Sequence, residues 1–144
     1  MRKSVFVMLS CLLPMAAMAS PEEKTCKFLA VMGANNASDV EGMLAEIAPR
    51  FDAAKQKQAT DTLRTLAEGA PFAGGSAWTV LELGDDLVEH LVLFRLKAGE
   101  IAGSRLRYEW SPDGPALTNI EFHRQYNEYA PTYAPTPPQA IDCS

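Results

Sequence analysis

The first half of the chain repeats its hydrophobic residues at the three- and four-residue spacing of a helix face. This spacing predicts three helices, at about 20–32, 38–49 and 51–68. Pro21 suits the first turn of the first helix, and Ser38 with Glu41 three residues later has the spacing of a capping box for the second. Gly69 marks the end of the third helix.

From residue 76 onward the pattern changes to the alternation that is typical of half-buried strands. It predicts four antiparallel strands, near 77–83, 87–97, 101–110 and 116–125. A three-residue loop at Pro112-Asp113-Gly114 is predicted between the last two strands, pairing Ser111 with Pro115. The same register sets Leu106 opposite Ile120 and Arg105 opposite Glu121, so that apolar meets apolar and plus meets minus.

The loop near Gly99 decides which residues of the second and third predicted strands face each other. A three-residue loop through Glu100 sets Val92 opposite Leu106 and His90 opposite Tyr108, which groups apolar residues on one face. The opposite face is then mainly polar and contains Arg105, Arg107, Glu121 and His123, with Leu91 and Leu93 among them. The predicted fold class is α+β, with N-terminal helices packed on the first face of a four-stranded antiparallel meander.

Helices followed by a meander that ends in a Pro-Asp-Gly hairpin and an Ile-Glu-Phe strand resemble the cystatin-like roll. More narrowly, the chain is similar to small secreted proteins of the nuclear-transport-factor-like superfamily, over residues 38–125 and above all in the segments 106–110 and 119–123. The resemblance implies a sheet that curves around helices and often leaves a cone-shaped pocket. Members include enzymes, ligand carriers and interaction modules, so the resemblance does not select a function.

The N-terminal segment has the three parts of a secretory signal peptide. Arg2 and Lys3 precede an apolar run to Leu13, and small residues stand at Ala17 and Ala19. We therefore predict a signal peptide at 1–19 and a secreted or periplasmic mature chain that begins at Ser20. Lipidation at Cys11 remains an alternative. The apolar run is shorter than a membrane span, and no later segment predicts one.

Removal of the predicted leader leaves two cysteines, Cys26 and Cys143. In an oxidising compartment such a pair predicts a disulfide; the alternatives are a reactive thiol or a metal ligand, but neither cysteine has a CxxC partner or a nearby histidine. We divide the mature chain into a single domain at 20–125 and a tail at 126–144, rich in proline and tyrosine, that the disulfide ties down. The prolines predict an extended path without ladder pairing as far as residue 139.

The net charge of the chain argues against nucleic acid as a partner. The chain has 13 basic and 18 acidic residues, a net charge of −5. Because both charged residues of the predicted leader are basic, the mature chain has 11 basic residues and a net charge of 11 − 18 = −7. Nucleic-acid binding requires clustered lysine and arginine, so no nucleic-acid partner is predicted.

The sequence contains no GxSxG motif, no phosphate-binding glycine loop and no cysteine–histidine cluster at zinc spacing, so neither a metal nor a cofactor is predicted. His90 and Tyr108 are the candidates for acid–base chemistry in a pocket. The polar face with Arg105, Arg107, Glu121 and His123 is the candidate surface for an anionic ligand or a partner protein. We expect an exported, non-catalytic protein that binds an unidentified small ligand or protein; the alternative is a pocket enzyme that uses His90 and Tyr108.

Overall fold

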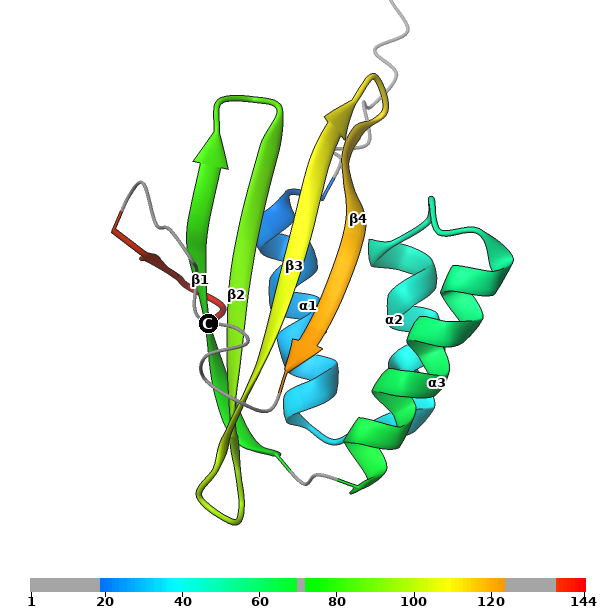
Figure 1. The fold of residues 1–144 in the computed structure, drawn as a ribbon, viewed down its shortest axis with the longest axis vertical. Helices are drawn as coiled ribbons and strands as arrows, with labels where there is room; N and C mark the ends of the chain where they lie inside the picture. The colour runs from blue at the N-terminus through cyan, green and yellow to red at the C-terminus, as the bar shows by residue number, and fades with distance from the viewer. Residues whose placement is uncertain (1–18, 70–71, 124–136) are drawn as a thin grey trace, which may run out of the picture.

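The computed structural model describes residues 19–69, 72–123 and 137–144 (Figure 1). The predicted signal peptide lies outside the described residues except for Ala19. The same holds for Cys11 and for most of the predicted tail, including its three tyrosines. Within the described part of the chain, no helix is long and apolar enough to span a membrane.

Three α-helices and one 3-10 turn come first: α1 (Pro21–Gly33), η1 (Ala37–Asp39), α2 (Val40–Ile47) and α3 (Ala53–Gly69). The capping box is found at α1, where the Ser20 hydroxyl accepts a hydrogen bond from the Glu23 amide at 3.2 Å and the Glu23 carboxylate accepts one from the Ser20 amide at 2.8 Å. The capping box predicted at Ser38 and Glu41 is wrong. The turn η1 occupies this position, and the Ser38 hydroxyl donates to the Asn36 side chain instead.

The sheet has five antiparallel strands in the order β4-β3-β2-β1-β5, one more than predicted. Their bounds are β1 (Phe72–Leu83), β2 (Leu87–Leu96), β3 (Ile101–Ser111), β4 (Gly114–His123) and β5 (Gln139–Ile141). The additional strand β5 pairs with residues 77–79 of β1. The prediction that pairing is absent as far as residue 139 is wrong at Gln139, because the prolines end at Pro138 and the next three residues have amides that can pair.

The predicted residue pairs in the β3–β4 hairpin are confirmed only in the part that lies far from the loop. Arg105 lies opposite Glu121 and Leu106 opposite Ile120, as expected. The loop itself has two residues rather than three, since Ser111 pairs with Gly114, and a bulge near Thr118 absorbs the difference.

The β2–β3 register differs from the prediction by two residues. His90 lies opposite Leu106, and Val92 lies opposite Ser104, because the three-residue loop comprises residues 97–99 and is closed by the Leu96 amide, which donates to the Glu100 carbonyl at 2.8 Å. A shift of two residues keeps every side chain on its predicted face, because the strand period is two. The predicted division into an apolar and a polar face is therefore confirmed.

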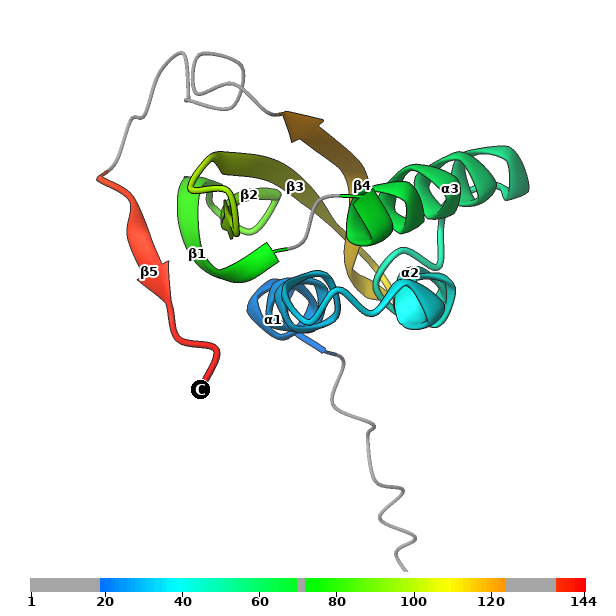
Figure 2. The ribbon, with the colours of Figure 1, turned by 90° about the horizontal axis from the view of Figure 1, so that it is seen from below.

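The sheet curves, and α1 lies on its inner side, while α2 and α3 lie further along, beside β4 (Figure 2). The buried core fills the space between α1, α2 and the inner face of the sheet; its largest fully buried side chains include Phe28, Phe72, Phe94, Met32, Leu44 and Leu106. Trp110, which alternation places on the same face as Leu106 and Tyr108, is nevertheless 40% exposed, because it lies at the end of β3. This α+β architecture is compatible with a cystatin-like roll.

Strand β1 begins before the predicted position, at Phe72, and its glycines allow α1 to approach it closely. A Cβ atom on Gly75 would lie 2.7 Å from Leu29 Cδ1 of α1 and 2.8 Å from the carbonyl oxygen of Leu93 on β2. Both distances are shorter than a normal contact, so this position requires glycine.

Substitution of Gly75 by alanine is expected to destabilise the protein by about 1–3 kcal/mol, because the added methyl group collides with a backbone carbonyl that the β1–β2 ladder holds in place. Urea denaturation measures the change. The matched control is Gly33→Ala, where no atom lies within 4 Å of the added carbon. Equal stability of the two variants would contradict the close approach.

Candidate functional site

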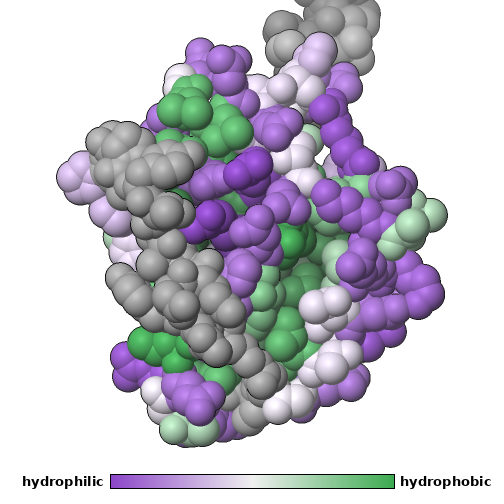
Figure 3. All heavy atoms as spheres, viewed as in Figure 1, coloured by the Kyte–Doolittle hydropathy of each residue, from purple (hydrophilic) through white to green (hydrophobic). Residues whose placement is uncertain are grey.

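The four candidate residues of the polar sheet face lie together on the side of the sheet that faces away from α1. Arg107 donates two hydrogen bonds to Glu89 Oε1, at 2.8 and 2.6 Å, and this bonding raises the pKa of Arg107. Arg105 lies opposite Glu121, whose Oε2 is 3.5 Å from His123 Nε2. Hydrophilic side chains accordingly gather over the middle of this face (Figure 3). These side chains neutralise one another, so the face presents paired charges to a ligand.

Glu89 is the residue of this network that the sequence did not single out. It is only 7% exposed although it lies on the outer face, and Arg107 is its partner. Next to the network, Val80 and Leu91 form a small apolar cluster with Trp78 and Leu93. The two halves of the outer face therefore differ, with apolar residues over β1 and β2 and charged residues over β3 and β4.

A cavity of about 300 Å³ lies between α3 and β4, and no site prediction included it. It is lined by side chains from the start and middle of α3 and from the second half of β4: Phe51, Lys55, Gln58, Ala59, Thr62, Leu63, Asn119, Ile120 and Phe122. Hydrophobic side chains are visible in the hollow between these two elements in Figure 3. Phe51, Ala59 and Leu63 have the spacing of a helix face that packs on a core, and periodicity alone cannot separate such a face from the wall of a cavity.

Of the described residues that line this cavity, Lys55 alone is charged. Its Nζ donates a hydrogen bond to the backbone carbonyl of Thr118 on β4 at 2.6 Å and lies 4.4 Å from the centre of the Phe51 ring. An ammonium group has three donors, so Lys55 can also bind an anionic group at this end of the cavity.

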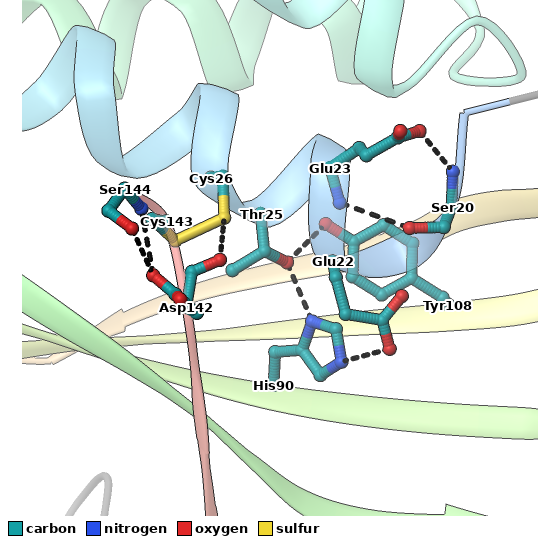
Figure 4. Close-up of a disulfide and its surroundings, with 10 residues drawn as sticks. All are labelled: Ser20, Glu22, Glu23, Thr25, Cys26, His90, Tyr108, Asp142, Cys143 and Ser144. Carbon is teal, nitrogen blue, oxygen red and sulfur yellow. Dashed lines mark hydrogen bonds and ion pairs between the residues drawn. A yellow bond between two sulfur atoms is a disulfide. The ribbon is translucent and has the colours of Figure 1, made fainter.

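His90 and Tyr108, the acid–base candidates, meet in the core through a residue of α1 (Figure 4). Thr25 Oγ1 lies 2.7 Å from His90 Nδ1 and 2.8 Å from the Tyr108 hydroxyl. All three residues are completely buried. Thr25 was not predicted as part of this group, because its position on α1 relative to the sheet depends on tertiary packing.

The carboxylate of Glu22, on the same side of α1, determines how protons are arranged in this group. Glu22 Oε1 lies 4.0 Å from His90 Nε2. A carboxylate attracts an N–H group, so we assign the proton of neutral His90 to Nε2. Thr25 then donates to His90 Nδ1 and accepts from Tyr108, which gives one directed chain of hydrogen bonds.

Burial keeps the His90 and Tyr108 side chains neutral. It lowers the pKa of His90 to about 4, and the charge of Glu22 only partly offsets this effect. Burial also raises the pKa of Tyr108 well above its usual range. A neutral histidine is a competent base, but a base must contact its substrate. The cavity between α3 and β4 does not reach His90 or Tyr108.

Replacement of Thr25 by valine is expected to destabilise the protein by about 1–3 kcal/mol, because His90 and Tyr108 would lose their shared buried partner while the shape of residue 25 is preserved. The control is Thr65→Val, an exposed threonine of α3 that bonds only to the carbonyl of Asp61. Chemical denaturation of both variants measures the difference. A loss of stability no larger than that of the control would show that the hydrogen bonds of Thr25 to His90 and Tyr108 contribute nothing to stability.

Cys26 of α1 and Cys143, which follows β5, are placed as a disulfide, as predicted (Figure 4). The sulfur atoms are 2.19 Å apart and the Cα atoms 5.3 Å apart. The bond connects the short strand β5 to the helix that carries Thr25 and Glu22. Among the described residues, no group of three or more His, Cys, Asp or Glu side chains is arranged to hold a metal ion.

Comparison with protein-family models, with curated proteins and with solved structures finds no match to the chain. The structural class of the protein is therefore described by its own fold. In the described residues it is an α+β domain with a five-stranded antiparallel sheet and a cavity beside the edge strand β4.

Proposed function

We propose that the protein is an exported, non-catalytic binding protein whose ligand occupies the cavity between α3 and β4. The observation that carries the proposal is the composition of the cavity wall. Among the described residues it consists of apolar and neutral polar side chains with one lysine, and none of these lining residues is a histidine, a cysteine or a carboxylate. Such a wall binds and orients a molecule but offers no acid–base pair or activated nucleophile.

Export is supported by one feature of the sequence and one of the structure. The segment 1–19 has the pattern of a secretory signal peptide. Cys26 and Cys143 are in bonding contact, and structural disulfides persist in oxidising compartments. A periplasmic or secreted location follows from the proposal.

The alternative, a pocket enzyme that uses His90 and Tyr108, has weaker support. The short hydrogen-bond chain and the shifted pKa values are features that active sites also show. However, both side chains are completely buried in the packed core, where Thr25 already bonds to His90 Nδ1 and to the Tyr108 hydroxyl. We therefore infer that the hydrogen bonds among Thr25, His90 and Tyr108 serve to stabilise the fold.

The chemistry of the cavity defines a probe for the proposed function. An apolar wall with one cation at its end suits a molecule that combines an apolar body with an anionic group, and 1-anilinonaphthalene-8-sulfonate is such a molecule. In a nuclear magnetic resonance titration at neutral pH, this probe is expected to shift the amide signals of α3 and β4 around the cavity. Ala59→Phe, which fills the cavity, should abolish binding, whereas Ala54→Phe on the exposed side of α3 should preserve it.

Two lysines of α3 test the charge. Lys55→Met is expected to weaken binding of the sulfonate about fivefold, which corresponds to the loss of one partly exposed ion pair. Lys57→Met is the control, because Lys57 is exposed and pairs with Asp61. If the probe does not bind, or shifts signals away from the cavity, the proposed function is wrong.

A further inference from the structure

We propose that the natural occupant of this cavity is an extended peptide with a free C-terminal carboxylate, which adds to the edge of β4 as a further antiparallel strand. This inference rests on the proposed function, because it assigns a partner class to the same cavity. Four features of the described residues support it: the open edge of β4, the uncapped backbone beside the cavity, the position of α3, and the position of Lys55.

Among the strands of the described residues, β4 is the last of the sheet and pairs with β3 alone. The unpaired N–H and C=O groups of an edge strand can bind another strand, and many peptide-binding domains use such an edge. The opposite edge of the sheet already has a partner, since β5 pairs with β1. Of the two edges, that of β4 is the one that lies beside the cavity between α3 and β4.

Two lysines cover the first half of this edge and leave the second half open. Lys24 donates to the carbonyl of Pro115, and Lys55 donates to the carbonyl of Thr118. In the part of the chain that the structure describes, the backbone groups of residues 119–122 form hydrogen bonds only with β3. The open half of the edge is the part that lines the cavity.

Helix α3 forms the opposite wall of the cavity, so an added strand would lie between a helix and an edge strand. Alternate side chains of a strand point to opposite sides. One set would enter the apolar cavity beside Ala59, Leu63 and Ile120, and the other set would face solvent. The volume of 300 Å³ is at the lower end of the roughly 300–1,000 Å³ that is common for small-molecule pockets, which favours a few inserted side chains over one large ligand.

Lys55 defines the direction of the peptide. Its Nζ contacts Thr118, at the end of the open edge where β4 first meets the cavity. A carboxylate at this end would pair with Lys55, so the peptide would run from residue 122 towards residue 118 of β4. That direction is antiparallel to β4 and therefore forms the more stable of the two types of ladder.

The test uses a probe peptide and chemical variants of its backbone. The probe is an acetylated hexapeptide of alternating threonine and valine with a free carboxylate, and the readout is the amide signals of residues 119–122 with their hydrogen-exchange rates. Binding is expected to shift these signals and to slow their exchange. N-methylation of the three peptide nitrogens that face β4 should abolish binding, while N-methylation of the other three should preserve it.

The carboxylate is tested together with Lys55. Amidation of the C-terminus is expected to weaken binding to the wild-type protein about fivefold and to have no effect on Lys55→Met, whereas Lys57→Met should respond as the wild type does. Equal affinities of both N-methylated peptides, or no binding of the hexapeptide, would overturn the strand proposal. If the sulfonate probe still binds under those conditions, the cavity remains a binding site and only the peptide is excluded.

A second copy of the chain is the competing occupant, because two β4 edges could pair with each other. Analytical ultracentrifugation separates the two cases. A monomer at concentrations where the peptide binds supports the proposal. A dimer that dissociates in Ile120→Lys would assign the edge to self-association and overturn it.

Discussion

Replacement of both Cys26 and Cys143 by serine is expected to lower the free energy of unfolding by about 2–5 kcal/mol. The two residues are separated by 117 positions, so the bond closes a loop that spans almost the whole described domain. In the chain-entropy account, a loop of that length restricts the unfolded chain more strongly than a short one does. The native contacts of β5 are few, with three residue pairs, so they cannot replace the bond.

Urea denaturation of the oxidised protein and of the doubly substituted variant measures this loss, and intact mass under non-reducing conditions verifies the bond by the absence of two hydrogens. Ser144→Ala is a suitable control because it changes only the exposed contact with Asp142 beside the bridge. In the double variant, hydrogen exchange in residues 77–79 of β1 should become faster, because β5 is released. A loss below about 1 kcal/mol would show that the bond makes little contribution.

The second large effect is a decrease in stability as the pH falls from about 6.5 to about 4. The imidazole of the unfolded chain accepts a proton near pH 6.5, whereas His90 in the folded protein accepts one only near pH 4. Between these values the unfolded state binds more protons, so acid favours unfolding. The contribution of His90 is complete above pH 6.5 and is lost towards pH 4, and it amounts to about 3 kcal/mol.

A pair of histidine variants isolates this contribution from that of the carboxylates. The free energy of unfolding is measured at pH 7 and at pH 4.5 for the wild type, His90→Asn and His123→Asn. The pH dependence should be smaller in His90→Asn than in either the wild type or His123→Asn, because only His90→Asn removes the completely buried imidazole. The same slope in all three proteins would show that His90 is not the group that titrates.

The sequence predicted the face of each strand residue better than its partner across the sheet. Alternation places Val92 and Leu106 on the same face, and a shift of the β2–β3 pairing by two residues leaves this assignment unchanged. The partner depends on the loop, and a three-residue loop one position earlier sets Val92 opposite Ser104. Pairing in the β3–β4 hairpin was predicted correctly at Arg105, because a bulge near Thr118 compensates for the shorter loop.

The candidate site was less predictable, because it depends on how α3 lies beside the sheet. The separation of His90 and His123 onto opposite faces followed from alternation alone, but the link between His90 and Tyr108 through Thr25 required the position of α1. The cavity beside β4 has no signature in the sequence, since Ala59 and Leu63 fit a core stripe equally well. The role of Lys55 as the charge at its end could not be predicted for the same reason.

The bridge between Cys26 and Cys143 also determines how the domain responds to a pulling force. Tension applied to the chain before residue 26 and after residue 143 passes from one Cα to the other across 5.3 Å, through covalent bonds. The five strands, α2, α3 and the cavity beside β4 lie inside the closed loop, so this tension does not reach them. Of the described helices and strands, only the start of α1, which carries Thr25, lies outside the loop and bears the load. A fusion partner or surface tether attached beyond either cysteine would therefore transmit load without stretching the sheet, and two such attachments would leave the domain from neighbouring points.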